Sequence, residues 1–296
     1  MSFSTDVKEE LFKLLPHERH CRLSELTAIL AFSGKRVGSS IFVYPTTETK
    51  VALRKCFTLL SKTFNINTDI LGKDLEESRE FIEFSRDNPD MVPVLDAIAG
   101  ETPVNLLVND CCKRAYLRGV FISAGYIEDP NKAYHLEFVC QDEASSEMLK
   151  ELLSDFDIEA RSVLRKKYYV VYIKGADAIQ DALSVMEAHK ALMELVNVKI
   201  YKDFRNDTNR RVNCEVANSA KAVSAGERQI ADINLIISKV GLDKLPKGLS
   251  EVAALRLEHP EISLTELGQY LDPPVGKSGV NHRLRKISEF ADSLRQ

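Results

Sequence analysis

The sequence predicts an α+β protein in which a duplicated α/β unit precedes an all-helical domain. Two observations support this fold class. The same order of six secondary-structure elements occurs twice within residues 1–200, and strand-like patterns stop soon afterwards. We therefore place the duplicated domain at residues 1–200, with halves of about 1–100 and 101–200. A linker rich in Asn and Arg follows at residues 201–219, and a helical domain occupies residues 220–296.

Each half of the duplicated domain follows the order helix, strand, helix, strand, strand, helix. Helices are predicted from apolar residues three and four apart, and strands from β-branched and aromatic runs. The first set covers residues 23–34, 39–46, 48–64, 66–71, 79–85 and 89–99. The second set covers residues 115–125, 133–140, 143–156, 158–164, 167–174 and 176–195. Equivalent positions of the two halves are about 90 residues apart, such as 91 from Leu26 to Leu117. A duplication explains this more simply than a chance alternation of helices and strands.

Composition is that of a globular protein, with 44% apolar and 28% charged residues. No apolar run approaches the ~20 residues of a membrane span. The six cysteines are scattered without a CxxC pair, which favours a reducing compartment. We therefore expect a cytoplasmic protein that makes no membrane contact.

The segment HERHC at residues 17–21 contains possible metal ligands in His17, His20 and Cys21. A tetrahedral site needs four ligands, and the sequence shows no second cluster that would complete it. We therefore expect solvated histidines near a helix end, with no metal and no cofactor.

Charge is distributed unevenly along the chain. The net charge of −4 argues against a nonspecific binder of polyanions. Residues 205–296 contain 14 Lys and Arg against 12 Asp and Glu, whereas residues 1–204 contain 26 against 32. A mild basic excess therefore lies at the C-terminal end.

The first helix of each half carries small residues at helical spacing. They are Ser24, Ala28 and Ala31 in one helix and Ala115, Gly119 and Ser123 in the other. Residues four apart share a face, and small side chains there let two helix backbones approach closely. We expect the two helices to pack together about a pseudo-twofold axis. Gly34 and Gly125 are expected to be C′ glycines that turn the chain out of each helix.

These helices resemble the LAGLIDADG motif of homing endonucleases, which aligns with residues 26–34 (LTAILAFSG) and 117–125 (LRGVFISAG). The resemblance implies a carboxylate before each final glycine, where it holds a divalent cation over the scissile phosphate. This sequence has Ser33 and Ala124 at those positions. We therefore expect the two helices to form only a packing contact, here called the seam, and the protein to have no enzyme activity.

The alternative is an endonuclease whose acids have moved. Glu128 and Asp129 follow the second glycine, but the surrounding YIEDPNK is typical of a turn. Lys35 and Arg36 follow the first glycine and would repel a metal ion.

The loops between the last two strands of each half differ in charge. The first loop is acidic and the second is basic: Asp74, Glu76 and Glu77 against Arg165, Lys166 and Lys167. Because phosphate contacts supply most nonspecific DNA affinity, the acidic loop is a poor DNA-binding arm. The basic loop could contact a phosphate, although a solvated hairpin tip is the simpler interpretation.

The C-terminal segment has the most specific local pattern. An apolar helix face ends before Pro260, and Ser263 with Glu266 forms a capping box that opens a second helix. After the rigid turn DPPVG, Ser278 is placed to cap a third helix. The core-facing stripe of this third helix consists of Val280, Leu284, Ile287 and Ala291.

The outer face of the third helix is polar and basic. Its residues are Lys277, Ser278, Asn281, His282, Arg283, Arg285 and Lys286. This order of helix, turn and basic helix is typical of the helix-turn-helix, whose second helix enters the major groove of double-stranded DNA. Asn can read adenine and Arg can read guanine, while Lys suits phosphates. The segment resembles region 4 of bacterial sigma factors, with a longer, proline-bearing turn.

Over its whole length the sequence resembles the WhiA family of bacterial regulators. The opening SFSTDVKEEL and the segment RNDTNRRVNCEVANSAKAV are the most family-specific parts. The resemblance implies a nucleoid-associated DNA-binding transcription regulator connected with cell division and sporulation. Its endonuclease-like domain would be non-catalytic, and the transcription machinery would be a protein partner. A protein-interaction scaffold with incidental DNA binding is a further alternative.

The linker contains three basic residues, Arg205, Arg210 and Arg211, among several Asn. They could contact a phosphate backbone or pack the two domains together. Packing is favoured because a flexible tether would be richer in Gly, Ser or Pro. We expect the linker to pass into a helix near Ala217.

Overall fold

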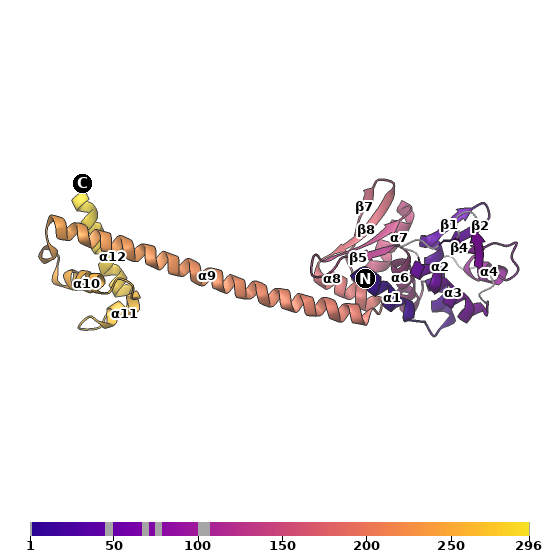
Figure 1. Ribbon diagram of the computed structural model, residues 1–296, viewed down its shortest axis with the longest axis horizontal. Helices are drawn as coiled ribbons and strands as arrows, with labels where there is room; N and C mark the ends of the chain where they lie inside the picture. The colour runs from indigo at the N-terminus through magenta and orange to yellow at the C-terminus, as the bar shows by residue number, and fades with distance from the viewer. Residues whose placement is uncertain (1, 45–49, 67–70, 75–78, 100–106, 296) are drawn as a thin grey trace. The chain divides into compact units, whose positions relative to one another are not determined.

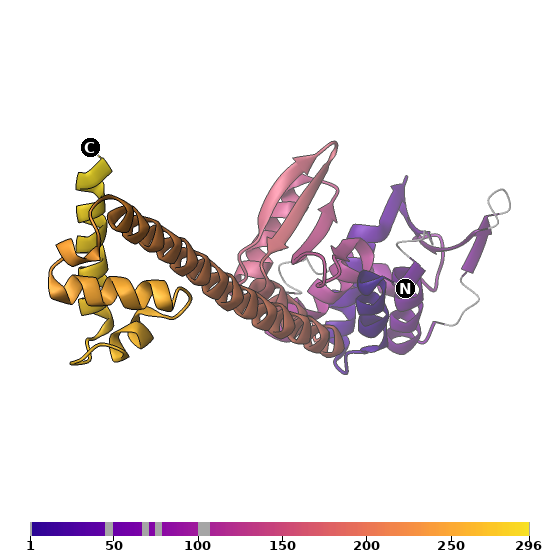
Figure 2. The same ribbon diagram turned by 60° about the vertical axis from the view of Figure 1, so that its left-hand side comes forward.

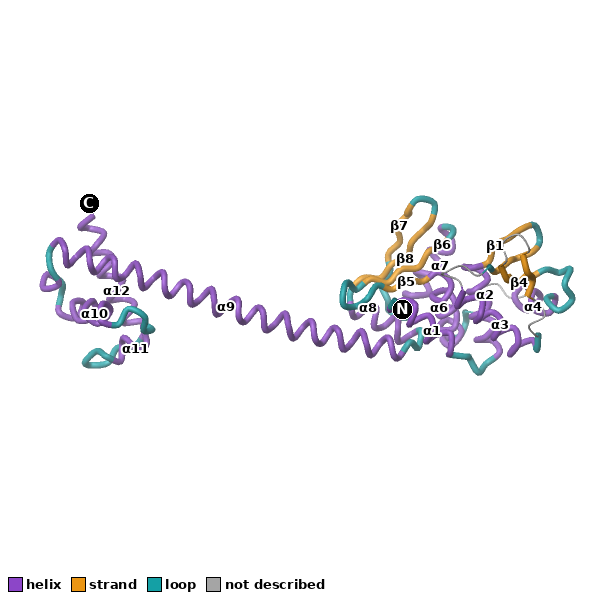
Figure 3. Tube along the Cα trace, viewed as in Figure 1, coloured by secondary structure: helices purple, strands orange, loops and turns teal. Residues whose placement is uncertain are grey.

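A computed structural model describes residues 2–44, 50–66, 71–74, 79–99 and 107–295 (Figure 1). The chain divides into two compact units, Met1–Lys202 and Asp203–Gln296, which are described separately. The first unit combines two sheets with helices, and the second is helical (Figure 3). Among the residues that the structure describes, no helix is long and apolar enough to span a membrane.

The first half of the first unit contains an antiparallel sheet in the order β1-β2-β4-β3. Its elements are α1 (Phe3–Lys13), α2 (Arg19–Ser33), β1 (Gly34–Val37), β2 (Ser40–Val43), α3 (Lys50–Phe64), β3 (Leu71–Asp74), β4 (Arg79–Phe84) and α4 (Val92–Ala99). The strand expected at residues 66–71 falls mostly outside the described residues, as do Glu76 and Glu77 of the acidic loop.

The second half repeats this topology, with the antiparallel order β5-β6-β8-β7. Its elements are α6 (Asp110–Ala124), β5 (Gly125–Ile127), β6 (His135–Cys140), α7 (Glu143–Ser154), β7 (Arg161–Arg165), β8 (Tyr168–Lys174) and α8 (Ala176–Val185). The equivalent strand orders agree with the predicted duplication. Each half has one strand more than expected, because β1 and β5 begin directly at the glycine that ends α2 or α6.

The two glycines at these helix ends do not have the predicted C′ conformation. Gly34 has φ −74° and ψ 132°, and Gly125 has φ −84° and ψ 149°, which is extended backbone open to any residue. Their small size is needed instead for close approach. A Cβ would lie 2.3 Å from the Leu30 carbonyl oxygen at Gly34 and 2.7 Å from the Phe121 carbonyl oxygen at Gly125.

The helix expected at residues 176–195 is interrupted. α8 ends at Val185, Glu187 adopts a positive φ of 64°, and a new helix, α9, begins at His189. Ala188 N–H donates to the Leu183 carbonyl oxygen at 2.9 Å, which closes the end of α8. The apolar spacing alone did not reveal this break because it continues across the turn.

The expected linker is also helical. α9 is a single helix over His189–Lys239, so the start predicted near Ala217 is wrong. The segment contains no Pro and only Gly226 as a helix-weakening glycine, so nothing in it ends a helix. Nearly all side chains from 203 to 224 are exposed, which explains why this part lacks an apolar stripe.

Helices α2 and α6 pack against one another in the first unit, as predicted (Figure 1). A Cβ on Gly119 of α6 would lie 2.5 Å from the Glu25 carbonyl oxygen and 2.7 Å from the Ala28 Cβ. Ser24 Oγ donates to the Cys112 carbonyl oxygen at 2.8 Å. Ala31, also expected on this face, is exposed. The two helix backbones thus approach closely at Gly119.

The second unit contains the C-terminal part of α9 and four further elements (Figure 2). They are η2 (Leu242–Lys244), α10 (Lys247–Glu258), α11 (Leu264–Gln269) and α12 (Lys277–Arg295). Their buried core consists of Ile233, Ile236, Leu245, Val252, Ala253, Leu267, Leu271, Val280, Leu284, Ile287 and Ala291. α12 packs against both α10 and α11, so its position is set by the helices before it.

We expect Gly119→Ala to destabilise the first unit by about 1–3 kcal/mol, since the added methyl overlaps a backbone carbonyl of α2. Gly226→Ala is the matched control, because its Cβ would meet no atom closer than 3.7 Å. Because Gly226 lies in the second unit, that control should leave the stability of the first unit unchanged. Denaturant unfolding followed by tyrosine fluorescence measures the first unit, which holds all tyrosines except Tyr270. Equal stability of wild type and Gly119→Ala would contradict the close packing.

Candidate nucleic-acid interface

Helix α12 presents two distinct faces. The predicted stripe of Val280, Leu284, Ile287 and Ala291 is buried. The opposite face is exposed and contains Lys277, Ser278, Asn281, His282, Arg285 and Lys286. The N-terminal half of α12 therefore offers hydrogen-bond donors and positive charge to solvent.

Ser278 does not cap α12, contrary to expectation. The helix begins at Lys277, and Val280 N–H donates to the Gly276 carbonyl oxygen at 3.1 Å. Gly276 therefore occupies the capping position, and Ser278 is an exposed residue in the first turn.

The two arginines of the outer face have different surroundings. Arg283 is half-buried, and its guanidinium donates to the Gly248 carbonyl oxygen of α10 at 3.4 Å. Arg285 is exposed and pairs with Glu289 at 3.1 Å one turn later. An exposed pair of this kind contributes little stability, so Arg285 can exchange Glu289 for a stronger partner.

Helix α11 is held at both ends. The predicted capping box is present: Glu266 N–H donates to Ser263 Oγ at 3.2 Å, and Ser263 N–H donates to a Glu266 carboxylate oxygen at 2.9 Å. After α11, Val275 N–H donates to the Gly268 carbonyl oxygen at 2.9 Å. A Cβ on Gly268 would lie 1.9 Å from the Val275 carbonyl oxygen. Glycine is thus required where the turn folds back onto α11.

A buried arginine that sequence reasoning missed supports the same region. Arg256 of α10 donates to Gln229 Oε1 of α9 at 3.0 Å and to the Ile262 carbonyl oxygen at 2.8 Å. Burial lowers the pKa of its guanidinium. Arg256 therefore joins α9, α10 and the loop before α11. In the sequence, Arg256 follows the core residue Val252 by four positions, which places both on the same face of the helix and could have indicated its burial.

The positions expected to carry catalytic acids lie at the ends of the paired helices. Ser33 is the last residue of α2 and Ala124 the last of α6. Ser33 Oγ is shielded from solvent and has no hydrogen-bond partner among the described residues, and the Ala124 side chain is a methyl group. Neither side chain supplies the negative oxygen that a hard divalent cation prefers.

The two acids after the second glycine are engaged in their own turn, as predicted. A Glu128 carboxylate accepts from Asp129 N–H at 3.0 Å and from the Tyr126 hydroxyl at 3.1 Å. Asp129 accepts from Asn131 N–H at 2.8 Å. The hydrogen bond from Asp129 N–H lowers the pKa of Glu128, and that from Asn131 N–H lowers the pKa of Asp129. In the first half, Lys35 and Arg36 are exposed in β1.

The basic loop of the second half is a tight hairpin tip. Arg165 pairs with Tyr168 across β7 and β8, which leaves Lys166 and Lys167 as a two-residue connection. All three basic side chains are exposed, and Arg165 lies 3.4 Å from Glu137. Arg205, Arg210 and Arg211 are likewise exposed, on α9. These groups are accessible to a phosphate backbone.

Comparison with known proteins identifies both parts of the chain. Residues 208–291 match the WhiA C-terminal HTH domain, and residues 113–205 match the WhiA LAGLIDADG-like domain. A "Probable cell division protein WhiA" of Lachnoclostridium phytofermentans is 45% identical over 314 residues, covering 100% of both chains. The chain belongs to the WhiA family. A second relative with the same description, from Alkaliphilus oremlandii, is 43% identical and covers 100% of this chain and 98% of that protein.

A solved structure of the WhiA family supports the same assignment. The crystal structure of full-length DUF199/WhiA from Thermatoga maritima matches with a TM-score of 0.62 at 26% identity, covering 99% of each chain. The α+β architecture thus combines a LAGLIDADG-like domain with a C-terminal helix-turn-helix domain, as predicted.

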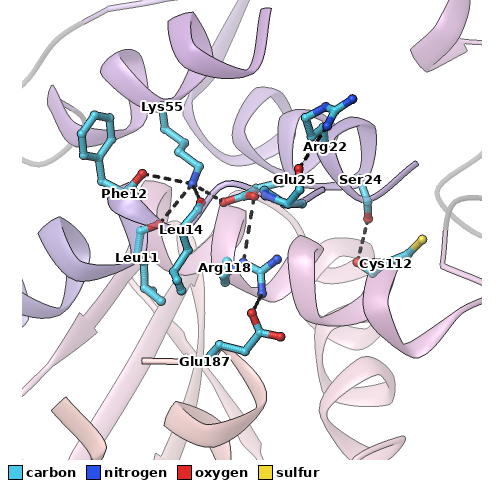
Figure 4. Close-up of polar contacts among 11 residues, drawn as sticks. Leu11, Phe12, Leu14, Arg22, Ser24, Glu25, Lys55, Cys112, Arg118 and Glu187 are labelled. Carbon is cyan, nitrogen blue, oxygen red and sulfur yellow. Dashed lines mark hydrogen bonds and ion pairs between the residues drawn. The ribbon is translucent and has the colours of Figure 1, made fainter. Parts of the chain in front are cut away.

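The seam of this WhiA-family chain contains a buried ion network that the sequence did not reveal (Figure 4). Lys55 Nζ lies 3.2 Å from a Glu25 carboxylate oxygen, and both side chains are fully buried. Lys55 also donates to the carbonyl oxygens of Leu11, Phe12 and Leu14. Four oxygens around one nitrogen favour the charged ammonium.

The network continues across the seam through Arg118 of α6. Its guanidinium lies 4.0 Å from Glu25 and 2.9 Å from Glu187, the residue at the break between α8 and α9. Burial raises the pKa of Glu25 and lowers the pKa of Lys55, and the opposite charges counteract both effects. The chain of charges therefore links α2, α3, α6 and the α8–α9 turn.

The sequence also did not reveal that two further potential metal ligands, Cys111 and Cys112, lie beside His20 and Cys21. His20 and Cys21 lie beside Cys111 and Cys112, and one ligand atom from each of the four lies within 4.8 Å of all the others. The expectation that no second ligand cluster exists is therefore wrong. All six cysteines are free thiols.

We expect Lys55→Met to lower the free energy of unfolding of the first unit by about 3–5 kcal/mol, because it leaves Glu25 buried without its main counter-ion. Lys62→Met makes the same change at an exposed position of α3 and should change stability by less than about 0.5 kcal/mol. Adding Glu25→Gln to Lys55→Met should restore part of the loss. Denaturant unfolding measures the free energy of unfolding of the wild type, the two single variants and the double variant. If Lys55→Met lost no more stability than Lys62→Met, the buried ion network would not stabilise the first unit.

Proposed function

We propose that this WhiA-family protein is a sequence-specific DNA-binding transcription regulator that reads bases with α12. The observation that carries the proposal is the exposed, acid-free N-terminal half of α12 on a fully packed helical core. A helix held in this way by a preceding helix and a tight turn is the arrangement with which helix-turn-helix proteins enter the major groove.

The proposed roles follow from where each side chain lies. Asn281 and Arg285 share the outer face with Ser278, so these residues are placed to reach base edges. Lys277, His282 and Lys286 lie beside them and suit phosphate contacts. Arg283, which contacts Gly248, is better placed to hold α12 on α10 than to reach a base.

We infer that the LAGLIDADG-like domain is non-catalytic, since Ser33 and Ala124 replace its expected acids and Glu128 and Asp129 are held in a turn. Its exposed hairpin tip at Arg165, Lys166 and Lys167 can add phosphate contacts, as can the arginines of α9. From the sequence resemblance of the C-terminal segment to sigma factor region 4, we propose the transcription machinery as a protein partner.

The biological setting is proposed from the relatives, which carry the description of probable cell division proteins. A regulator of this kind would act at the nucleoid in the cytoplasm, on genes of cell division and, in sporulating bacteria, sporulation. The free thiols of all six cysteines are compatible with that compartment.

We expect Arg285→Ala to weaken specific DNA binding by about 1–3 kcal/mol and to relax preference at one base position. Lys286→Ala should weaken binding to all sequences and reduce the slope of affinity against salt by about 1. Lys244→Ala removes an exposed charge elsewhere in the second unit and should leave both quantities unchanged. Binding titrations over a salt series, with selected and scrambled DNA, measure each effect. Unchanged specificity in Arg285→Ala would exclude Arg285 as a base-reading residue of α12.

The competing function is a metal-dependent endonuclease with relocated acids. We expect no cleavage of supercoiled plasmid or random-sequence DNA with Mg²⁺ or Mn²⁺. Reproducible cleavage that depends on the protein, and that disappears on Glu128→Gln, would overturn the proposal that the first unit is non-catalytic. A scaffold with incidental DNA binding would instead show neither cleavage nor sequence preference.

A further inference from the structure

Four potential metal ligands meet where the two seam helices begin. His20 and Cys21 lie in the first turn of α2, and Cys111 and Cys112 lie in the first turn of α6. His20 Nδ1 is 3.1 Å from Cys112 Sγ and 3.3 Å from Cys21 Sγ. Among the residues that the structure describes, these four form the group whose ligand atoms all lie within 4.8 Å of one another.

The duplication explains why these residues meet. His20 and Cys111 are separated by 91 positions, as are Cys21 and Cys112, and this is the offset between Leu26 and Leu117 of the paired helices. The two ligand pairs therefore occupy equivalent positions in the two halves. Since α2 packs against α6, their first turns lie together, and each helix contributes an adjacent pair.

The local surroundings hold the four side chains in place. Ser24 Oγ donates to the Cys112 carbonyl oxygen at 2.8 Å and fixes the start of α6 against α2 (Figure 4). Arg22 donates to the carbonyl oxygens of Pro16 at 3.1 Å and His17 at 2.6 Å, which secures the segment leading into His20. Lys113 pairs with Asp155 at 2.7 Å, so the lysine next to the thiols is engaged elsewhere.

The geometry is close to that of a tetrahedral site. Ligand atoms ~2.0–2.3 Å from a central Zn²⁺ lie about 3.3–3.8 Å apart, so side-chain rotations that bring the atoms together by about 1 Å suffice. The ligand pairs lie in the first turns of two helices, so the backbone positions both pairs beside the same point.

Simple packing of buried thiols does not account for the group. Cys56 and Cys140 are buried among apolar side chains, as packing thiols usually are. In the cluster, by contrast, His20 and Cys111 are exposed while Cys21 and Cys112 are buried. A polar ring and an accessible thiol beside two buried thiols match a site that an ion can enter from solvent.

We propose that His20, Cys21, Cys111 and Cys112 bind one Zn²⁺ ion, which fastens the N-terminal ends of α2 and α6. One histidine and three cysteines are a ligand set of structural zinc sites, in which all four positions are filled by protein. The ion would hold the two halves of the first unit together at the end of the seam opposite Ser33 and Ala124. This role is independent of DNA binding by the second unit.

The test uses the full chain, reduced and stripped of metal, and titrated with Co²⁺ as a spectroscopic substitute for Zn²⁺. We expect one Co²⁺ per chain, visible bands of tetrahedral cobalt, and thiolate-to-cobalt charge transfer. Zn²⁺ should displace the Co²⁺ and raise the unfolding temperature of the first unit. Addition of a chelator should reverse that increase.

Cys111→Ser should lower Co²⁺ affinity at least about tenfold while leaving the fold intact, because Cys111 is exposed. His20→Asn should do the same and also change the visible bands. Cys214→Ser is the matched control, since Cys214 is an exposed thiol of α9, and it should bind Co²⁺ like the wild type.

Three results would overturn the proposal. The first is less than stoichiometric binding by the reduced wild type. The second is a Co²⁺ spectrum without thiolate charge transfer. The third is equal affinity in Cys111→Ser, His20→Asn and Cys214→Ser. If Cys111→Ser fails to fold, His20→Asn and the wild-type spectrum still decide between these outcomes.

Discussion

The close approach of α2 and α6 positions the rest of the first unit. At Gly119 the α6 backbone lies so near α2 that a single methyl group would overlap the Glu25 carbonyl oxygen. Each sheet begins at the glycine ending one of these helices, so the placement of both sheets follows from the helix pair. A duplicated fold whose halves meet along two helices depends on small residues at that contact.

Three chemically different regions lie along the same helix pair. The first turns bring together a histidine and three thiols, the middle holds the charges of Glu25 and Arg118, and the last residues are Ser33 and Ala124. Ser33 and Ala124 occupy the positions where acids were expected, so this end of the helix pair lacks those metal ligands. Each buried charge has an ion-pair partner, because Lys55 pairs with Glu25 and Glu187 pairs with Arg118.

The parts of this structure that could be predicted are those encoded by local patterns. The capping box at Ser263 and the stripe from Val280 to Ala291 depend on spacings of three and four, and both are present. Helix α9 was missed in part because a polar helix exposed on all sides has no apolar periodicity to detect. Gly34 and Gly125 were placed correctly at helix ends, but for the wrong reason, since their role is close approach.

Long-range contacts account for most of what the sequence did not reveal. In the sequence, Glu25 and Lys55 resemble ordinary surface residues. In the structure both are buried, because α3 packs against α2. The partners of His20 and Cys21 are 91 positions away, and only the repeat offset pairs them. The central proposal assigns base reading to α12 and helix packing to the first unit, and one measurement tests it directly. Genomic DNA fragments bound by the full chain should yield a motif that Asn281→Ala with Arg285→Ala abolishes and that Lys166→Ala with Lys167→Ala preserves. A motif lost with the hairpin lysines but kept without Asn281 and Arg285 would contradict it.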